Sequence, residues 1–174
     1  MFIHYKRGLK SSKKPVDIYQ GRLKIGEIQR TYRNSFIYWL DTIALDAEWF
    51  ISYKIINKDG NLKFQSKETS SFFSRTQFDI TYSDSDDQQH ELILKQKKGI
   101  GVKNFKFKYK DNTYLVQKYP FEPTQILYNN LTVAECKTTI ADRTTTIQLY
   151  GDDFKVEPLL IVGIYHSAFF IQRG

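Results

Sequence analysis

The 174-residue chain has little of what holds several common classes of protein together. Its single cysteine, Cys136, excludes an internal disulfide framework and a cysteine-based zinc ribbon. Nine glycines and four prolines are too few for a collagen-like or linker-like chain. No N-terminal apolar run is long enough for a secretory signal, so we expect a cytoplasmic protein. The most apolar stretch, residues 158–171, is shorter than the ~20 residues of a membrane-spanning helix.

The sequence also lacks a recognisable catalytic motif. There is no nucleophile elbow, zinc-protease motif, phosphate-binding glycine loop or dinucleotide fingerprint. Among the three histidines, His166 lies in the apolar stretch and is expected in the core, and Cys136 is expected to be a buried apolar filler. The acidic run 84–87 lacks the glycine and the distal glutamate of a calcium loop, so we expect a solvated acidic loop. We therefore expect no enzyme activity, no cofactor and no metal.

Aromatic residues and alternating runs are abundant. Twelve Tyr, thirteen Phe and two Trp favour strands, where flat side chains pack well. The turn at Asp59-Gly60 joins two alternating runs, and Asp111-Asn112 joins two more, as in β-hairpins. About ten to twelve strands are predicted before residue 151. For residues 35–47 a strand pair and a short helix fit equally.

The pattern changes after Gly151. Glu157 and Pro158 are typical of a helix start, and the residues that follow are apolar on every face. A helix without a polar face must be surrounded on all sides. We therefore predict one mainly β domain over 1–174, a closed antiparallel barrel with an axial helix at about 157–171 and Gly163 at the closest approach of the helix to the wall. Closure also removes exposed strand edges.

Three segments carry a family resemblance: GRLKIGEI at 21–28, the hairpin at 59–60, and DDFKVEPLLIVGI at 152–164. In their order and spacing they resemble the tubby C-terminal-domain-like superfamily, and in particular the small proteins related to LURP-one and to the phospholipid scramblases. The resemblance implies a twelve-stranded barrel that encloses a C-terminal apolar helix. It also implies a surface that meets phosphoinositides or other membrane lipids.

The positive charge is concentrated in two segments. Residues 1–38 and 95–118 each carry a net charge of +7, which equals the net charge of the whole chain. In residues 95–110, strand alternation directs the aromatic side chains inward and the lysines outward, where they can form an anion-binding stripe. A solvated face with no ligand is an equal alternative. The basic residues of the first segment could extend the stripe if the fold brings them near. The candidate binding residues are Lys97, Lys98, Lys103, Lys106, Lys108 and Lys110.

Three partners are compatible with this stripe. Anionic phospholipid at the inner membrane surface ranks first, because each nearby Lys or Arg contributes ~1 kcal/mol to binding an acidic leaflet. A protein partner of a scaffold barrel is the alternative. Nucleic acid ranks third, because alternation points the aromatic rings away from the lysines and so separates stacking from phosphate contact.

Overall fold

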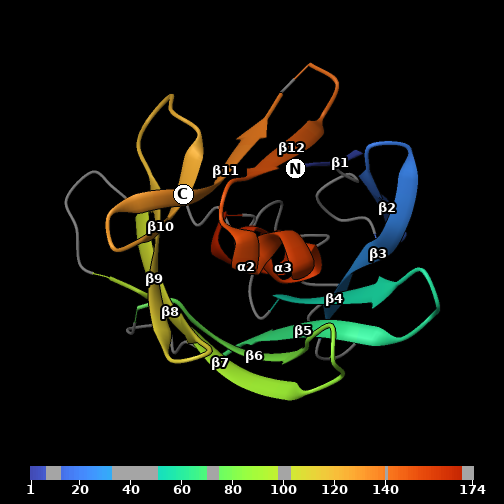
Figure 1. The fold of residues 1–174 in the computed structure, drawn as a ribbon, viewed down its shortest axis with the longest axis horizontal. Helices are drawn as coiled ribbons and strands as arrows, with labels where there is room; N and C mark the ends of the chain where they lie inside the picture. The colour runs from blue at the N-terminus through green and yellow to red at the C-terminus, as the bar shows by residue number, and fades with distance from the viewer. Residues whose placement is uncertain (7–12, 33–50, 70–74, 98–102, 140, 170–174) are drawn as a thin grey trace.

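The computed structural model describes residues 1–6, 13–32, 51–69, 75–97, 103–139 and 141–169. Within them, twelve antiparallel strands close into a barrel around a helix (Figure 1). Around the barrel the strands follow the order β1-β12-β11-β10-β9-β8-β7-β6-β5-β4-β3-β2. Their bounds are β1 Phe2–Lys6, β2 Val16–Gln20, β3 Leu23–Tyr32, β4 Ile51–Asn57, β5 Leu62–Glu68, β6 Gln77–Ser83, β7 Gln89–Gln96, β8 Lys103–Tyr109, β9 Asn112–Lys118, β10 Thr124–Tyr128, β11 Leu131–Thr138 and β12 Thr144–Leu149. The predicted closed barrel of about twelve strands is confirmed, whereas residues 35–47 lie outside the described part.

Both predicted hairpins form, each through local turn chemistry. Between β4 and β5, the side-chain oxygen of Asn57 accepts hydrogen bonds from the backbone N–H groups of Asp59 and Asn61. Gly60 in the same turn has φ +86°, a conformation that glycine adopts without strain. Between β8 and β9, Lys110 and Asp111 have φ +44° and +63°, as a two-residue hairpin loop requires. These turns set which strand pairs with which.

Alternation places one side chain of every two inside the barrel. In β6, Phe78, Ile80 and Tyr82 are buried, while Asp79 and Thr81 between them are exposed. Each inward layer therefore adds apolar area to a single continuous core. Cys136 belongs to this core, as expected, and burial raises the pKa of its thiol.

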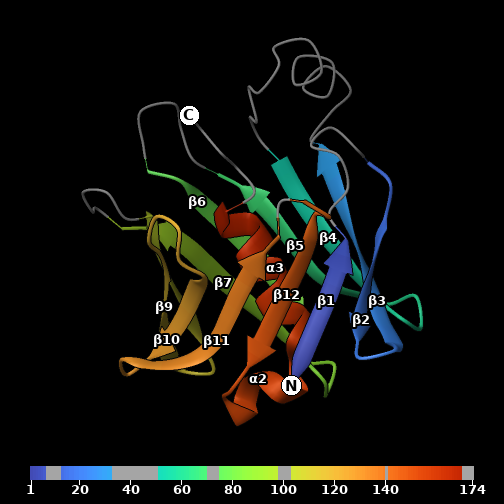
Figure 2. The same cartoon turned by 90° about the horizontal axis from the view of Figure 1, so that it is seen from above.

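The helix α3, Pro158–Phe169, runs through the lumen of the barrel (Figures 1 and 2). All residues from Leu159 to Phe169 are buried, which confirms the predicted all-round apolar helix. A Cβ built on Gly163 would lie 2.5 Å from two atoms of the Phe64 ring, so the helix can pass the wall there because this residue has no side chain. A short helix that the sequence analysis missed, α2 Asp152–Val156, precedes it. Neither these helices nor any other part of the described chain forms a helix long and apolar enough to cross a membrane.

Candidate anion-binding site

The backbone ladder between β7 and β8 is short. The two strands pair at two positions, Lys95 opposite Lys106 and Gln96 opposite Phe105. By contrast, β8 and β9 pair along the whole of both strands. Beside this short ladder the outer wall is hollowed into a pocket of about 440 Å³.

Backbone hydrogen bonds fix the segments that carry the pocket. The N–H of Gln96 donates to the carbonyl of Thr76 over 2.9 Å, and the N–H of Thr76 donates back to the Gln96 side chain over 3.3 Å. The N–H of Lys97 donates to the carbonyl of Asn104 over 2.8 Å. These bonds hold Arg75, which precedes β6, and Lys97, which follows β7, beside the same pocket.

Among the described residues, five cationic side chains line the pocket and no carboxylate does. The cations are Arg75, Lys95, Lys97, Lys106 and Lys108, with Ile93, Gln96 and Phe107 completing the lining. Ile93 is 56% exposed and supplies an apolar wall, whereas the ring of Phe107 is buried beneath. The pocket thus combines concentrated positive charge with an apolar side.

Like charges stand close together in this pocket. Lys95 and Lys106 occupy directly opposed positions, an arrangement that disfavours strand pairing. Two unit charges ~6 Å apart in water repel by ~0.7 kcal/mol. Among the described residues, no carboxylate comes within ion-pair distance of Arg75, Lys95, Lys97 or Lys106. A bound anion would relieve this repulsion.

Lys108 is the one lining cation with an ion-pair partner in the described chain. Its Nζ lies 2.9 Å from Oδ1 of Asp111, whose side chain is 98% exposed. An exposed pair of this kind contributes little to stability and exchanges easily with another anion. Lys108 can therefore exchange Asp111 for an anionic ligand with little loss of folding stability.

A second, smaller hollow of about 180 Å³ adjoins the first on the outer wall. Lys97 and Lys106 line both hollows, so the two share a cationic border. The remaining lining is polar and aliphatic: Thr113, Leu115, Leu127, Asn129 and Asn130. Hydroxyl and amide groups next to a cationic pocket suit a ligand that carries hydroxyl groups beside its phosphate.

The alternation predicted for β8 is confirmed. Phe105, Phe107 and Tyr109 are buried in the barrel, and Lys106 and Lys108 are exposed on its outer face. The aromatic rings therefore point into the barrel, and Phe107 borders the pocket only from beneath. No stacking platform from this strand accompanies the lysines.

The six candidate lysines have different environments. Lys97, Lys106 and Lys108 line the pocket. Lys110 does not line it: β8 has ended, and its Nζ lies 3.3 Å from Oδ2 of Asp84. Lys98 is outside the described residues, and of Lys103 only its backbone place at the start of β8 is described.

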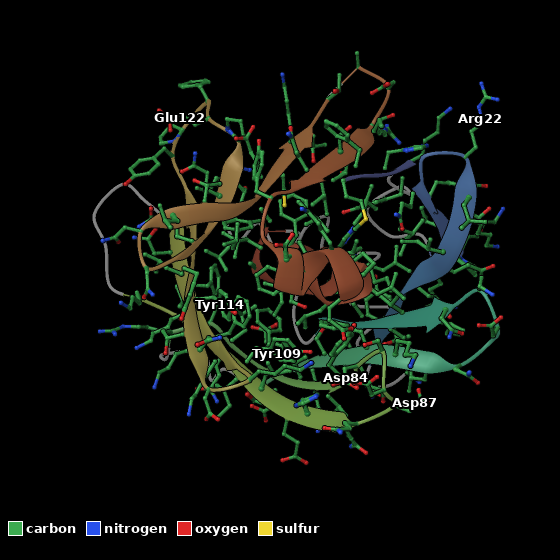
Figure 3. The ribbon with its side chains drawn as sticks, viewed as in Figure 1. Arg22, Asp84, Asp87, Tyr109, Tyr114 and Glu122 are labelled. Atoms are coloured by element: carbon green, nitrogen blue, oxygen red, sulfur yellow. The ribbon has the colours of Figure 1, made fainter. Side chains whose placement is uncertain are left out.

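The described part of the N-terminal basic segment, residues 1–6 and 13–32, does not extend the site, and its remaining basic residues lie outside the described chain. In the barrel order, four strands separate β3 from β8, so the two lie on different sides of the wall. Figure 3 places Arg22 far from Tyr114 of β9, across the barrel. Lys24 is occupied by Asp17, 2.7 Å away, and by Glu27. Among the described residues, the stripe is thus confined to the strands around β7 and β8.

Sequence reasoning missed two lining residues, Arg75 and Lys95. Lys95 could have been found, because it continues the outward face of β7 in phase with exposed Ile93. Arg75 could not, because its approach depends on the pairing of β6 with β7.

A second polar cluster lies in the wall near the start of α3, and Figure 3 shows Asp84 and Tyr109 on this part of the barrel. Asp84 is 1% exposed, so the prediction of a solvated acidic loop is wrong for this residue. Burial alone would raise the pKa of its carboxyl, but hydrogen bonds from His90, from the N–H groups of Gln88 and Asp86 and from Lys110 outweigh burial and lower it to about 2. The loop folds inward because its backbone N–H groups need this carboxylate.

Glu157 belongs to the same cluster and is 2% exposed. It accepts hydrogen bonds from the hydroxyl of Tyr82 and from both the N–H and the hydroxyl of Ser85. Burial and the bond to Glu157 raise the pKa of Tyr82. The carboxylate ties the start of α3 to the β6–β7 loop, which is a structural role. In the described chain no group of His, Cys, Asp and Glu side chains could hold a metal ion.

Comparison with known proteins gives one result. A family model for the Tubby C-terminal-like domain matches residues 3–171, nearly the whole chain. We found no match among curated proteins and none among solved structures. The match agrees with the twelve-stranded barrel and with its enclosed helix.

Proposed function

This chain belongs to the Tubby C-terminal-like domain family, and on that premise we propose that it is a non-enzymatic barrel that binds anionic phospholipid headgroups through the pocket between β7 and β8. Domains of this kind bind phosphoinositides and are generally non-enzymatic. The observation that carries the proposal is the convergence of five cations on one pocket whose described lining holds no carboxylate. On this proposal the protein works in the cytoplasm, at the inner membrane surface, where anionic lipid is concentrated.

The positive charge of the pocket is large enough to bind an anionic lipid surface. At ~1 kcal/mol for each basic residue near an anionic leaflet, five residues contribute ~5 kcal/mol. This corresponds to an affinity gain of more than ~10³-fold over a neutral membrane, since ~1.4 kcal/mol is tenfold. The hydroxyl and amide groups of the adjoining hollow favour a headgroup that carries hydroxyls as well as phosphate. Nucleic acid fits less well, because Phe105 and Phe107 are buried and offer no ring to stack on a base.

Vesicle co-sedimentation tests the proposal. We expect the protein to pellet with phosphatidylcholine vesicles that contain phosphatidylserine or phosphoinositide, but not with phosphatidylcholine alone, and added salt should weaken the binding. The double variant Lys95→Gln/Lys106→Gln should bind ~25-fold more weakly, from the loss of ~2 kcal/mol. Its melting temperature should not fall, because the substitutions remove a repulsion.

A matched control separates the pocket from net charge. Lys6→Gln/Lys137→Gln removes the same charge from exposed positions on β1 and β11, outside the pocket. We expect its binding to change less than ~3-fold. Equal losses in the two double variants would reject the pocket as the site. Equal binding to neutral and anionic vesicles at low salt would reject lipid headgroup recognition and leave a protein partner as the alternative.

A further inference from the structure

The loop between β9 and β10 exposes an aromatic side chain completely. Phe121 has a relative exposure of 108%, higher than that of any other large apolar residue described. Tyr119, two residues earlier, is 41% exposed. The loop projects from the barrel wall in Figures 1 and 2, and Figure 3 places Glu122, the neighbour of Phe121, at the outer rim. No apolar contact of the fold accounts for this ring.

The backbone at Phe121 is also unusual for its residue type. The N–H of Glu122 donates to the carbonyl of Tyr119 over 3.3 Å, which closes a four-residue turn. Pro120 stands second in this turn, and Phe121 stands third with φ +65°. These are the features of a type II turn, whose third position is normally Gly or Asn because it needs positive φ. A side chain with a Cβ is strained there.

The other positions of positive φ show which residue types this chain usually has in such a backbone conformation. Apart from glycines, the described residues with positive φ are polar or charged, with Phe121 as the exception: Asp87, Lys110, Asp111, Asn129, Asn130 and Arg143. At Phe121 the backbone is strained, and no burial of the side chain compensates for this strain. An outlier of this kind indicates a role outside the folded chain.

We propose that Phe121 inserts into the apolar layer of a lipid bilayer and anchors the barrel there, with Tyr119 at the level of the headgroups. The aromatic ring is fully exposed on a turn that contains proline, so it loses little conformational freedom on insertion. Insertion removes its whole surface from water, which is favourable in free energy. Tyr combines an apolar ring with a polar end, which suits the membrane interface. Glu122 follows at once and limits insertion to the tip of the loop. This inference rests on the proposed function, because it takes the same membrane as the partner.

The strand pairing places this loop at the same end of β8 and β9 as Lys97, one of the cations of the pocket. Lys118, the last residue of β9, pairs with Lys103, the first of β8. Lys97 is bonded one residue further along β8, to Asn104. The loop that carries Phe121 continues directly from Lys118. A bilayer that meets this end of the barrel would therefore reach the loop and, of the pocket cations, Lys97 first.

A fluorescent label tests insertion directly. The variant Phe121→Cys, labelled with an environment-sensitive nitrobenzoxadiazole group, reports the polarity at the tip; Cys136 is 1% exposed and will not compete for the label. The matched control is Leu23→Cys, which is 62% exposed at the start of β3, a strand separated from β8 by four others in the barrel order. With vesicles containing phosphatidylserine, we expect a blue shift and an intensity gain at position 121 and neither at position 23.

The variant Phe121→Gly separates anchoring from folding. Glycine suits the third position of a type II turn, so this variant should melt about 2–4 °C higher than the natural protein. It should nevertheless bind the same vesicles about tenfold or more weakly, because the inserted ring is gone. Undiminished binding by Phe121→Gly overturns the inference. So does a label at position 121 whose surroundings stay as polar as those of the label at position 23 on vesicles that the protein binds.

The outcomes distinguish this inference from the proposed function. Lipid-dependent sedimentation without a response at position 121 refutes the anchor and leaves headgroup binding in place. A response at 121 with equal binding to neutral and anionic vesicles supports the anchor and refutes headgroup selectivity. No sedimentation with any vesicle refutes both, and an exposed ring that contacts another protein would then be the explanation to pursue.

Discussion

Gly163 offers a sharp test of the enclosed helix. In an exposed helix, replacing glycine by alanine stabilises by ~1 kcal/mol. Inside this barrel, the new Cβ would lie 2.5 Å from two atoms of the Phe64 ring, far closer than the ~3.5–4.0 Å of ordinary carbon contacts. Phe64 is fully buried, so its ring has no solvent to move into. The helix or the wall must therefore shift by ~1 Å, which is about the difference between these two distances.

The magnitude follows from two opposed effects. Overpacking of a filled core destabilises by ~1–3 kcal/mol, and we take the upper part of this range because several ring atoms are involved. Subtracting the ~1 kcal/mol gain in helix propensity leaves a net loss of ~1–2 kcal/mol for Gly163→Ala. For a chain of this length, that loss lowers the melting temperature by ~2–8 °C.

Urea and thermal denaturation of four proteins would measure the effect: the natural chain, Gly163→Ala, Phe64→Leu and the double variant. In the Phe64→Leu background the flat ring is absent, so alanine at position 163 should be neutral or stabilising. As a control, Ala168→Gly in the same helix should destabilise by ~1 kcal/mol or more, from lost propensity and a lost buried methyl group. A higher melting temperature for Gly163→Ala in the natural background would refute the close packing of α3 against β5.

Two further predictions concern the same barrel. Ile164 is fully buried on a helix enclosed on every side, so Ile164→Asp buries an unpaired carboxylate. The cost of several kcal/mol is a large part of a typical free energy of unfolding of ~5–15 kcal/mol. Loss of the near-UV dichroism would show this effect, and a cooperative, native-like melt of the variant would contradict it. Asp84 has its pKa lowered in the folded state from 3.8 to about 2, so it stabilises the fold above pH ~4 and this contribution disappears as the pH falls toward 2. Asp84→Asn should therefore be less stable than the natural protein at neutral pH and should approach it at pH 2; a constant difference across this range would refute the assignment.

Much of the barrel could be predicted because its signals are local. Alternation in β6 and β8 and turn residues such as Asp59-Gly60 act over two to four positions, so they are readable without a structure. The helix α3 could be predicted from the sequence, because a helix that is apolar on all sides must be enclosed by the rest of the protein. The helix α2 was missed because its five residues are too few to show a period.

The sequence could predict only those residues of the candidate site whose position depends on the alternation of a single strand. Alternation sets the outward direction of Lys106 and Lys108. Lys110 is exposed as well, but the positive φ in the turn brings its ammonium group to Asp84 and not into the pocket. Arg75 enters the pocket through hydrogen bonds between Thr76 and Gln96, which are twenty residues apart. Such long-range pairing leaves no mark in the local sequence.

The departures from the rules of folding indicate where the function of this barrel lies. Inside, the apolar layers and the helix agree with alternation, packing and burial, and even the buried carboxylate of Glu157 has its donors. Outside, Lys95 faces Lys106 across a short ladder, and Phe121 occupies a turn position that suits glycine. Each feature lowers the stability of the isolated chain. One partner, a surface with negative charge above an apolar layer, would neutralise the facing lysines and cover the exposed ring. The outer wall and the β9–β10 loop are therefore where binding should be sought.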